Sequence, residues 1–208
     1  AVAVQDHGEC LEGSNRRFRF ALWREFVQNG GEMIRLAHRD VPPCYTRMQA
    51  VQQDAPGAIL MDTGPAALWG ILEDQQAAAH QDEGFIAVNV GNQHTIGVLL
   101  RGERVLGLFE HHTALMTTEK LRQLVERLRL GALADEEVFA DHGHGAYVDP
   151  AYTPGSGFGF VAVTGPQRHM ADGLGYHFAA PYGDMMLTGC FGLVTAARRV
   201  LAGSAGQG

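Results

Sequence analysis

Three runs of β-forming residues, separated by two glycine-centred turns, constrain the fold of this chain more than any other feature. The runs cover residues 85–90, 94–100 and 104–109, and the turns contain Gly91–Asn92 and Gly102–Glu103. Glycine readily adopts the backbone conformations of two-residue hairpin turns. The pattern therefore predicts a three-stranded antiparallel meander. After it, leucines and a valine recur at helical spacing over 121–128, which predicts a helix packed on that sheet.

The remaining elements predict a mixed α/β fold. Strands are expected near 137–141, 158–164 and 176–180, followed by a buried helix ending near residue 201. Strands joined by hairpins and covered by helices are typical of a layered α/β domain. Upstream, residues 1–4 read as a strand, and a domain seldom begins inside its core sheet. We interpret 1–84 as the continuation of an N-terminal portion, 85–203 as a C-terminal domain and 204–208 as a flexible tail.

Composition narrows the possible functions. The chain has 208 residues and a net charge of −7, without the clustered Lys and Arg that are typical of nucleic-acid binding. No apolar run reaches the roughly 18 residues that span a bilayer. Cys10, Cys44 and Cys190 lie far apart and are odd in number, which fits a reducing compartment. We expect a cytoplasmic protein that binds a small molecule, with no nucleic-acid or membrane partner, and oligomerisation stays open.

Histidines gather near the predicted strand ends. Neutral imidazoles with a nearby carboxylate can ligate a transition metal, and they also suit general acid–base catalysis near neutral pH. Adjacent residues of a strand point to opposite faces, so His111 and His112 can share one site only if the strand has ended. The alternative is a set of surface or structural histidines. We take as catalytic candidates Asp6, His7, His142 and His144, with His111, His112 and Asp62 as further crevice residues.

The turn at residues 91–95 is a candidate phosphate site. Gly91 allows close backbone approach, and the turn amides and the Thr95 hydroxyl can donate hydrogen bonds. Arg168 follows another strand end, where its fork of donors can hold an anion or form a salt bridge. Asp62 either takes part in catalysis or caps the helix that follows it. A plain hairpin turn is the alternative interpretation of residues 91–95.

Three segments resemble one half of the actin-like ATPase superfamily, which includes sugar kinases and heat-shock chaperones. They are NVGNQHT (89–95), VAVTGPQRH (161–169) and DMMLTGCFGLVTAA (184–197). The resemblance implies a ribonuclease H-like domain and ATP with Mg²⁺ as possible cofactors. Asn89 stands where the superfamily usually has an aspartate, and Pro166 removes an N–H after Gly165, which puts ATP hydrolysis in question. The implied phosphate or nucleotide contacts are Asn89, Gly91, Asn92, His94, Thr95, Gly165 and Arg168.

Over nearly its whole length the chain is similar to a prokaryotic family labelled "putative pyruvate formate-lyase activating enzyme". The likeness rests on segments such as AVAVQDHG, ILMDTGPAALWGIL, EHHT and DHGHGAY. An enzyme of that kind needs closely spaced cysteines for an iron–sulfur cluster, whereas the cysteines here are 34 and 146 residues apart. Three hypotheses follow: an actin-like protein that binds a nucleotide or phosphate, a histidine- or metal-dependent enzyme acting on a small polar molecule, or a non-catalytic oligomerisation or partner-binding domain.

Overall fold

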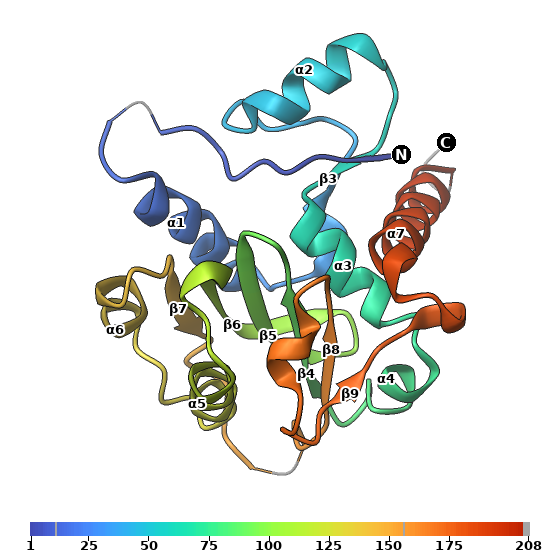
Figure 1. Ribbon diagram of the computed structural model, residues 1–208. Coiled ribbons are helices and arrows are strands. Elements are labelled where there is room, and N and C mark those ends of the chain that lie inside the picture. The colour runs from blue at the N-terminus through green and yellow to red at the C-terminus, as the bar shows by residue number, and fades with distance from the viewer. Residues whose placement is uncertain (11, 156, 206–208) are drawn as a thin grey trace.

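The computed structural model describes residues 1–10, 12–155 and 157–205, which form an α/β fold with two sheets (Figure 1). The larger sheet has the strand order β7-β6-β5-β4-β8-β9, and the smaller has the order β1-β3-β2. The strands of the larger sheet are β4 (Phe85–Val90), β5 (His94–Arg101), β6 (Arg104–His112), β7 (Gly145–Val148), β8 (Val161–Thr164) and β9 (His177–Phe178). Those of the smaller sheet are β1 (Val2–Ala3), β2 (Ala37–His38) and β3 (Leu60–Met61).

The predicted meander is confirmed. Strands β4, β5 and β6 pair antiparallel, β7 joins β6 antiparallel, and β8 and β9 run parallel to β4. The strand predicted at 137–141 is wrong, because residues 135–140 form helix α6 (Asp135–Ala140). Three acidic residues in its first turn favour the positive end of a helix, and Val138 is its one buried residue. The sequence therefore offers no alternating pattern there.

Helices cover both faces of the larger sheet, which is the physical basis of the two main cores. Alternate residues of β4 point to opposite faces, so Phe85 and Ala87 belong to one core and Ile86 and Val88 to the other. On the first face pack α1 (Asn15–Gln28), α3 (Thr63–Ile71) and α7 (Thr188–Ala205), and on the second α5 (Thr118–Arg129) and α6. The first core contains residues from both sides of Gly84, the boundary predicted from sequence.

Helices α3 and α7 pack closely through glycines. A Cβ added at Gly192 would meet the Ala66 carbonyl and the Gly70 amide, and one at Gly70 would meet the Thr188 carbonyl. Residues Met185–Gly203 are long and apolar enough to cross a membrane by length and composition, with a mean hydropathy of 1.3, and 28% of the segment is buried. No apolar run of this length is predicted from the sequence, because Arg198 and Arg199 interrupt it. The segment nevertheless qualifies by length and mean hydropathy, so that prediction is corrected. Helix α7 also includes residues 204 and 205, the start of the predicted tail, whose remainder lies outside the described residues.

A third, smaller core supports the N-terminal segment. Val41, Met48 and Leu60 form it, with Val2 and Val4 packed against it. Helix α2 (Thr46–Asp54) belongs to this unit, and Figure 1 shows it above the larger sheet, beside the N-terminus. Short helices and 3-10 turns complete the chain: α4 (Gln75–Ala79), Met33–Leu36, Thr113–Leu115, Arg168–Ala171, Pro181–Gly183 and Met185–Leu187.

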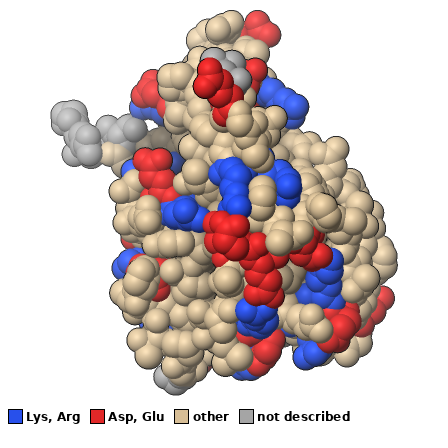
Figure 2. Space-filling model, turned by 90° about the vertical axis from the view of Figure 1, so that its left-hand side faces the viewer, with Lys and Arg blue, Asp and Glu red and all other residues tan. Residues whose placement is uncertain are grey.

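Ion pairs join α1 to α6. Arg17 contacts Asp135 at 3.5 Å and Glu136 at 2.6 Å, and Arg24 also pairs with Asp135. On the face seen in Figure 2, basic and acidic side chains lie next to one another rather than in separate patches. These contacts fix the helix that carries Arg16 and Arg19 against the segment that leads to His144.

Candidate functional site

Four of the predicted histidines converge at one edge of the larger sheet. His94 starts β5 and His112 ends β6, where the two residues pair across the strands. His144 lies just before β7, and His7 comes from the N-terminal segment. The ring centroids of His7 and His94 are 4.4 Å apart, and those of His94 and His112 are 4.9 Å apart. The ring of His144 lies 4.9 Å from that of His94 and 4.8 Å from that of His112.

Three of these imidazoles present nitrogen atoms to a common point. One nitrogen from each of His7, His94 and His144 lies within 4.8 Å of the other two. His144 is only 4% exposed, and its Nδ1 is buried with no hydrogen-bond partner among the described residues. A buried polar atom without a partner is costly, and native structures seldom leave one unexplained. The three imidazole nitrogens could together hold a metal ion.

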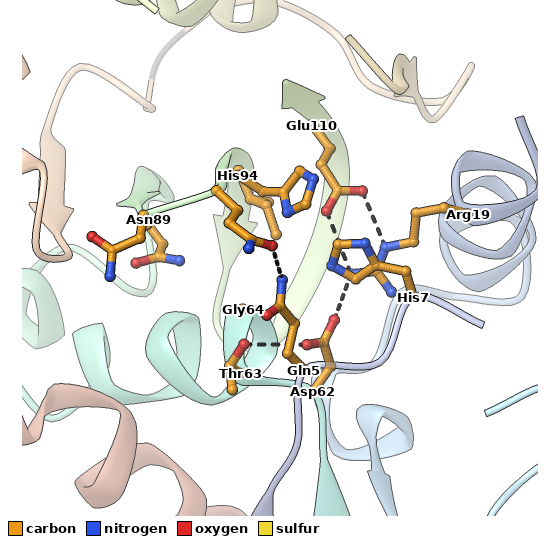
Figure 3. A pocket seen from close by; sticks show the side chains of 13 residues that line it. Gln5, His7, Arg19, Asp62, Thr63, Gly64, Asn89, His94 and Glu110 are labelled. Atoms are coloured by element: carbon orange, nitrogen blue, oxygen red, sulfur yellow. Dashed lines mark hydrogen bonds and ion pairs between the residues drawn. The ribbon is translucent and has the colours of Figure 1, made fainter. Parts of the chain in front are cut away.

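A cavity of about 290 Å³ adjoins the cluster (Figure 3). Its wall is mostly polar and includes four side-chain amides, of which Gln5 donates to Gln93 at 2.7 Å. Helix α3 contributes its first two residues. The lining residues are Gln5, His7, Arg19, Asp62, Thr63, Gly64, Asn89, Gly91, Asn92, Gln93, His94, Ile96 and Glu110.

Buried charges form one side of this cavity. Arg19 Nη2 donates to Asp62 Oδ2 at 2.6 Å, and Arg19 Nε donates to Glu110 Oε2 at 3.1 Å. The Trp23 indole also donates to Glu110 Oε2, at 3.0 Å. Figure 3 shows the two carboxylates reaching Arg19 from different sides. Because two acids share one guanidinium, the group carries a net negative charge beside the imidazoles.

Burial and neighbouring charges set the protonation states. Burial lowers the pKa of His94 to about 3 and that of His144 to about 4, and it also lowers the pKa of His7. For Glu110 burial opposes ionisation, but the charge on Arg19 prevails and lowers its pKa to about 2. At neutral pH the three imidazoles are therefore neutral, with lone pairs free to bind a cation, next to an ionised carboxylate.

Several predicted site residues lie elsewhere. The Asp6 carboxylate accepts hydrogen bonds from the Gly8 and Met48 amides. It thereby caps the first turn of α2, where Tyr45 at the N-cap position makes no side-chain cap bond. His111 points to the opposite face from His112, as strand alternation requires, and contacts Asp141. His142 is exposed, has a left-handed φ of 66°, and is not among the described histidines whose rings meet in the cluster.

Some of the predicted phosphate-binding residues line a cavity, and others lie elsewhere. Asn89, Gly91 and Asn92 line both the histidine cavity and a second cavity of about 330 Å³, which also contains Gly165. Thr95 is fully buried on the opposite face, where its hydroxyl bonds to that of Thr113 at 3.0 Å, so it cannot reach a phosphate at the turn. Arg168 starts a 3-10 turn and lines neither cavity.

Sequence reasoning missed Arg19 and Glu110, although both left a signal. Arg19 lies on α1 four residues before buried Trp23, and a cation on a buried helix face requires an acidic partner. Glu110 lies two residues before His112, hence on the same strand face, within an otherwise apolar run. Asp62 stands at the N-cap position of α3 but makes no side-chain cap bond, since its carboxylate is used by Arg19.

The fold and the site together define an α/β protein with a histidine-lined cavity at the edge of a mixed sheet. Residues 1–170 match the model of the family described as "Putative pyruvate format-lyase activating enzyme (DUF1786)", and the chain belongs to this family. No curated protein matches the sequence. Among solved structures, a chain of a "PilM-PilN type IV pilus biogenesis complex" is similar over 73% of this chain, with 15% identity and a TM-score of 0.40. This chain covers 56% of that one, so it spans little more than half its length.

Proposed function

We propose that His7, His94 and His144 hold a divalent transition-metal ion that acts on a small polar molecule in the adjoining cavity. The observation that carries this proposal is the convergence of three imidazole nitrogens within 4.8 Å, one from a side chain whose buried Nδ1 has no partner among the described residues. A metal ion would satisfy a lone pair that the described protein groups leave unused.

The charges around the cluster favour a cation. The cavity wall carries one positive charge, on Arg19, and two negative charges, on Asp62 and Glu110. Because the neighbouring imidazoles are neutral, a negative charge remains uncompensated. Glu110 is fully buried and ionised, so it would stabilise a metal ion electrostatically. Since its pKa is far below neutrality, it is poorly suited to act as a general base.

Donor chemistry limits the kind of metal. Imidazole suits zinc, iron, nickel and copper, whereas calcium and magnesium prefer oxygen. Three histidines leave coordination positions open, which is typical of catalytic sites, and an ion held in this way can activate water and polarise a carbonyl group. The 290 Å³ cavity is large enough for a small polar molecule. Thr63, Asn89 and Gln5 line it and would orient such a molecule by hydrogen bonds.

Elemental analysis of the full chain, purified and reloaded with zinc or cobalt, tests the proposal. We expect about one ion per chain, and loss of that ion in His94→Ala and His144→Ala. His142→Asn is the matched control, since it removes an exposed imidazole two residues from His144 and Asn tolerates positive φ. Absence of stoichiometric metal after loading, or equal loss in the His142 control, would contradict the proposal.

A second candidate is nucleotide or phosphate binding by an actin-like, ribonuclease H-like half. The strand order β6-β5-β4-β8-β9, with only β5 antiparallel to its neighbours β4 and β6 and with β8 and β9 parallel to β4, favours it. An added Cβ at Gly165 would meet the Val90 carbonyl oxygen and lie 2.8 Å from Asn89 Oδ1, so the two turns approach closely beside the 330 Å³ cavity.

Calorimetric titration with ATP and Mg²⁺ tests this second candidate. If Asn89 stands in the place of a magnesium-binding aspartate, Asn89→Asp should strengthen Mg²⁺-dependent binding, because a carboxylate binds Mg²⁺ more strongly than an amide. No heat with either protein would count against it. We do not extend the family's description to radical chemistry, because Cys190 lies on α7 whereas Cys10 and Cys44 lie in the N-terminal unit.

A further inference from the structure

We propose that Asp141 and His111 are positioning residues for His144, which they hold at the metal site from the opposite face of the sheet. This inference rests on the proposed metal function. Asp141 and His111 neither line the cavity nor belong to the three-histidine cluster, and His111 is a buried histidine outside that cluster.

The ring of His144 has no hydrogen bond of its own to orient it. Its Nδ1 is buried without a partner among the described residues. Histidines that bind metals usually donate their other ring nitrogen to a carboxylate or carbonyl group, which fixes the ring. With Nδ1 assigned to the metal, the nitrogen available for such a bond is Nε2, and it has no hydrogen-bond partner among the described residues. Here the orientation of the ring before metal binding depends on the backbone of the segment that carries it, residues 141–144.

That segment is fixed by contacts at each residue. The His144 amide donates to the Glu110 carbonyl at 2.9 Å, and the Gly143 amide to the Val138 carbonyl at 2.8 Å. Arg16 donates to the Gly143 carbonyl at 2.7 Å, just before His144. The segment therefore lies between α1, the end of α6 and β6, and its course is set before any ligand arrives.

His111 and Asp141 form the anchor on the far side. His111 is completely buried, and its Nε2 lies 3.1 Å from Asp141 Oδ2. Gly143 lies close to the same ring, since a Cβ there would be 2.7 Å from His111 Cδ2. Asp141 contacts His111, whereas the His144 ring lies beside His112, so the two side chains reach opposite faces of β6. Loss of the anchor would leave the segment held only by its backbone hydrogen bonds and Arg16, so the His144 ring would be positioned less precisely.

Cobalt-loaded full chain provides the test, through its visible absorption spectrum and its metal affinity in competition with a chelator. Asp141→Ala should weaken metal binding and alter the spectrum, by less than the roughly 10- to 100-fold that follows loss of a direct partner of a metal ligand. Asp141→Asn keeps an oxygen acceptor for His111 and should recover most of the affinity. Lys120→Met is the matched control, because Lys120 is the other partner of Asp141 Oδ2, at 2.7 Å, and forms no hydrogen bond with His111 among the described residues.

His111→Gln is the second variant, read by the same spectrum together with thermal unfolding. A purely structural role would lower the unfolding temperature while leaving the cobalt spectrum and affinity of the folded protein unchanged, and this result would overturn the inference. Equal weakening by Asp141→Ala and Lys120→Met would also overturn it. If the unmodified chain binds no metal, the proposed function itself fails, whereas normal metal binding in all anchor variants refutes only the positioning role.

Discussion

Arg19 and Glu110 meet inside the protein as a nearly water-free ion pair. Their side chains are 4% and 0% exposed, and Nε lies 3.1 Å from Oε2. Helix α1 and strand β6 are thus joined by charge at the wall of the histidine cavity, and Asp62 joins α3 to the same guanidinium. Desolvating three charged groups is costly. The arrangement is stable only because each group has its partners.

Arg19 has two acidic partners in this network, whereas Glu110 and Asp62 share one cation, and a first prediction follows from this difference. Arg19→Met leaves two buried carboxylates without a cation, whereas Glu110→Gln leaves Arg19 paired with Asp62. Removing one member of a buried pair typically costs about 3–5 kcal/mol. We therefore expect Arg19→Met to lose about that much in the free energy of unfolding and Glu110→Gln clearly less. Denaturant titration measures both, and equal losses would contradict the shared-cation arrangement.

Stability of the metal-free chain should fall with acid. Burial lowers the pKa of His94 to about 3 and of His144 to about 4, below the 6.5 of an exposed histidine. The unfolded chain therefore binds more protons below pH 6.5, so the free energy of unfolding decreases as pH falls from 6.5 towards 4. Glu110 adds a further loss between about pH 4.5 and its pKa of about 2. Unfolding of His94→Gln should depend less steeply on pH between 6.5 and 4.5, and an unchanged slope would argue against a neutral, buried His94.

The contact between α3 and α7 can be tested with two glycines of one helix. A Cβ at Gly192 would meet the backbone of α3 and lie 2.8 Å from Trp69 Cβ, whereas one at Gly189 has only the Ala67 amide within reach, at 3.9 Å. Gly192→Ala should destabilise by about 1–3 kcal/mol, as overpacking does. Gly189→Ala should be neutral or stabilise by up to about 1 kcal/mol, since alanine favours helix. Chemical denaturation of both variants provides the comparison.

His142 offers a prediction of increased stability. Its φ of 66° disfavours a residue with a Cβ, by roughly 1–2 kcal/mol in the left-handed region. Glycine removes this cost but loses more backbone entropy on folding. The free energy of unfolding of His142→Gly should therefore be higher by about 0.5 kcal/mol. His142→Ala keeps the strain and should show no gain. The midpoint of urea unfolding distinguishes them, and a loss on mutation to glycine would indicate an unrecognised contact of the imidazole.

Local patterns predicted the sheet, whereas the site depends on long-range contacts. The turns at Gly91 and Gly102 and the apolar runs beside them specify the meander, because hairpin geometry is set by adjacent residues. The approach of His7 to His94 has no such local cause, since it follows from the β1–β3 pairing and the Asp6 cap on α2. A strand is predicted at 137–141 because that prediction does not use the acidic start of α6, which is a helix signal. Arg19 is not predicted as a site residue, because its two acidic partners lie 43 and 91 residues away in the sequence.

The triad draws on sequence positions 7, 94 and 144, and its nearest supports lie at 16, 48 and 110. During synthesis on the ribosome, the first imidazole is made long before the last. The three imidazoles cannot meet until the chain up to β7 has been made. A metal ion bound as proposed would therefore load late, after folding, and would not be the nucleus around which the protein assembles.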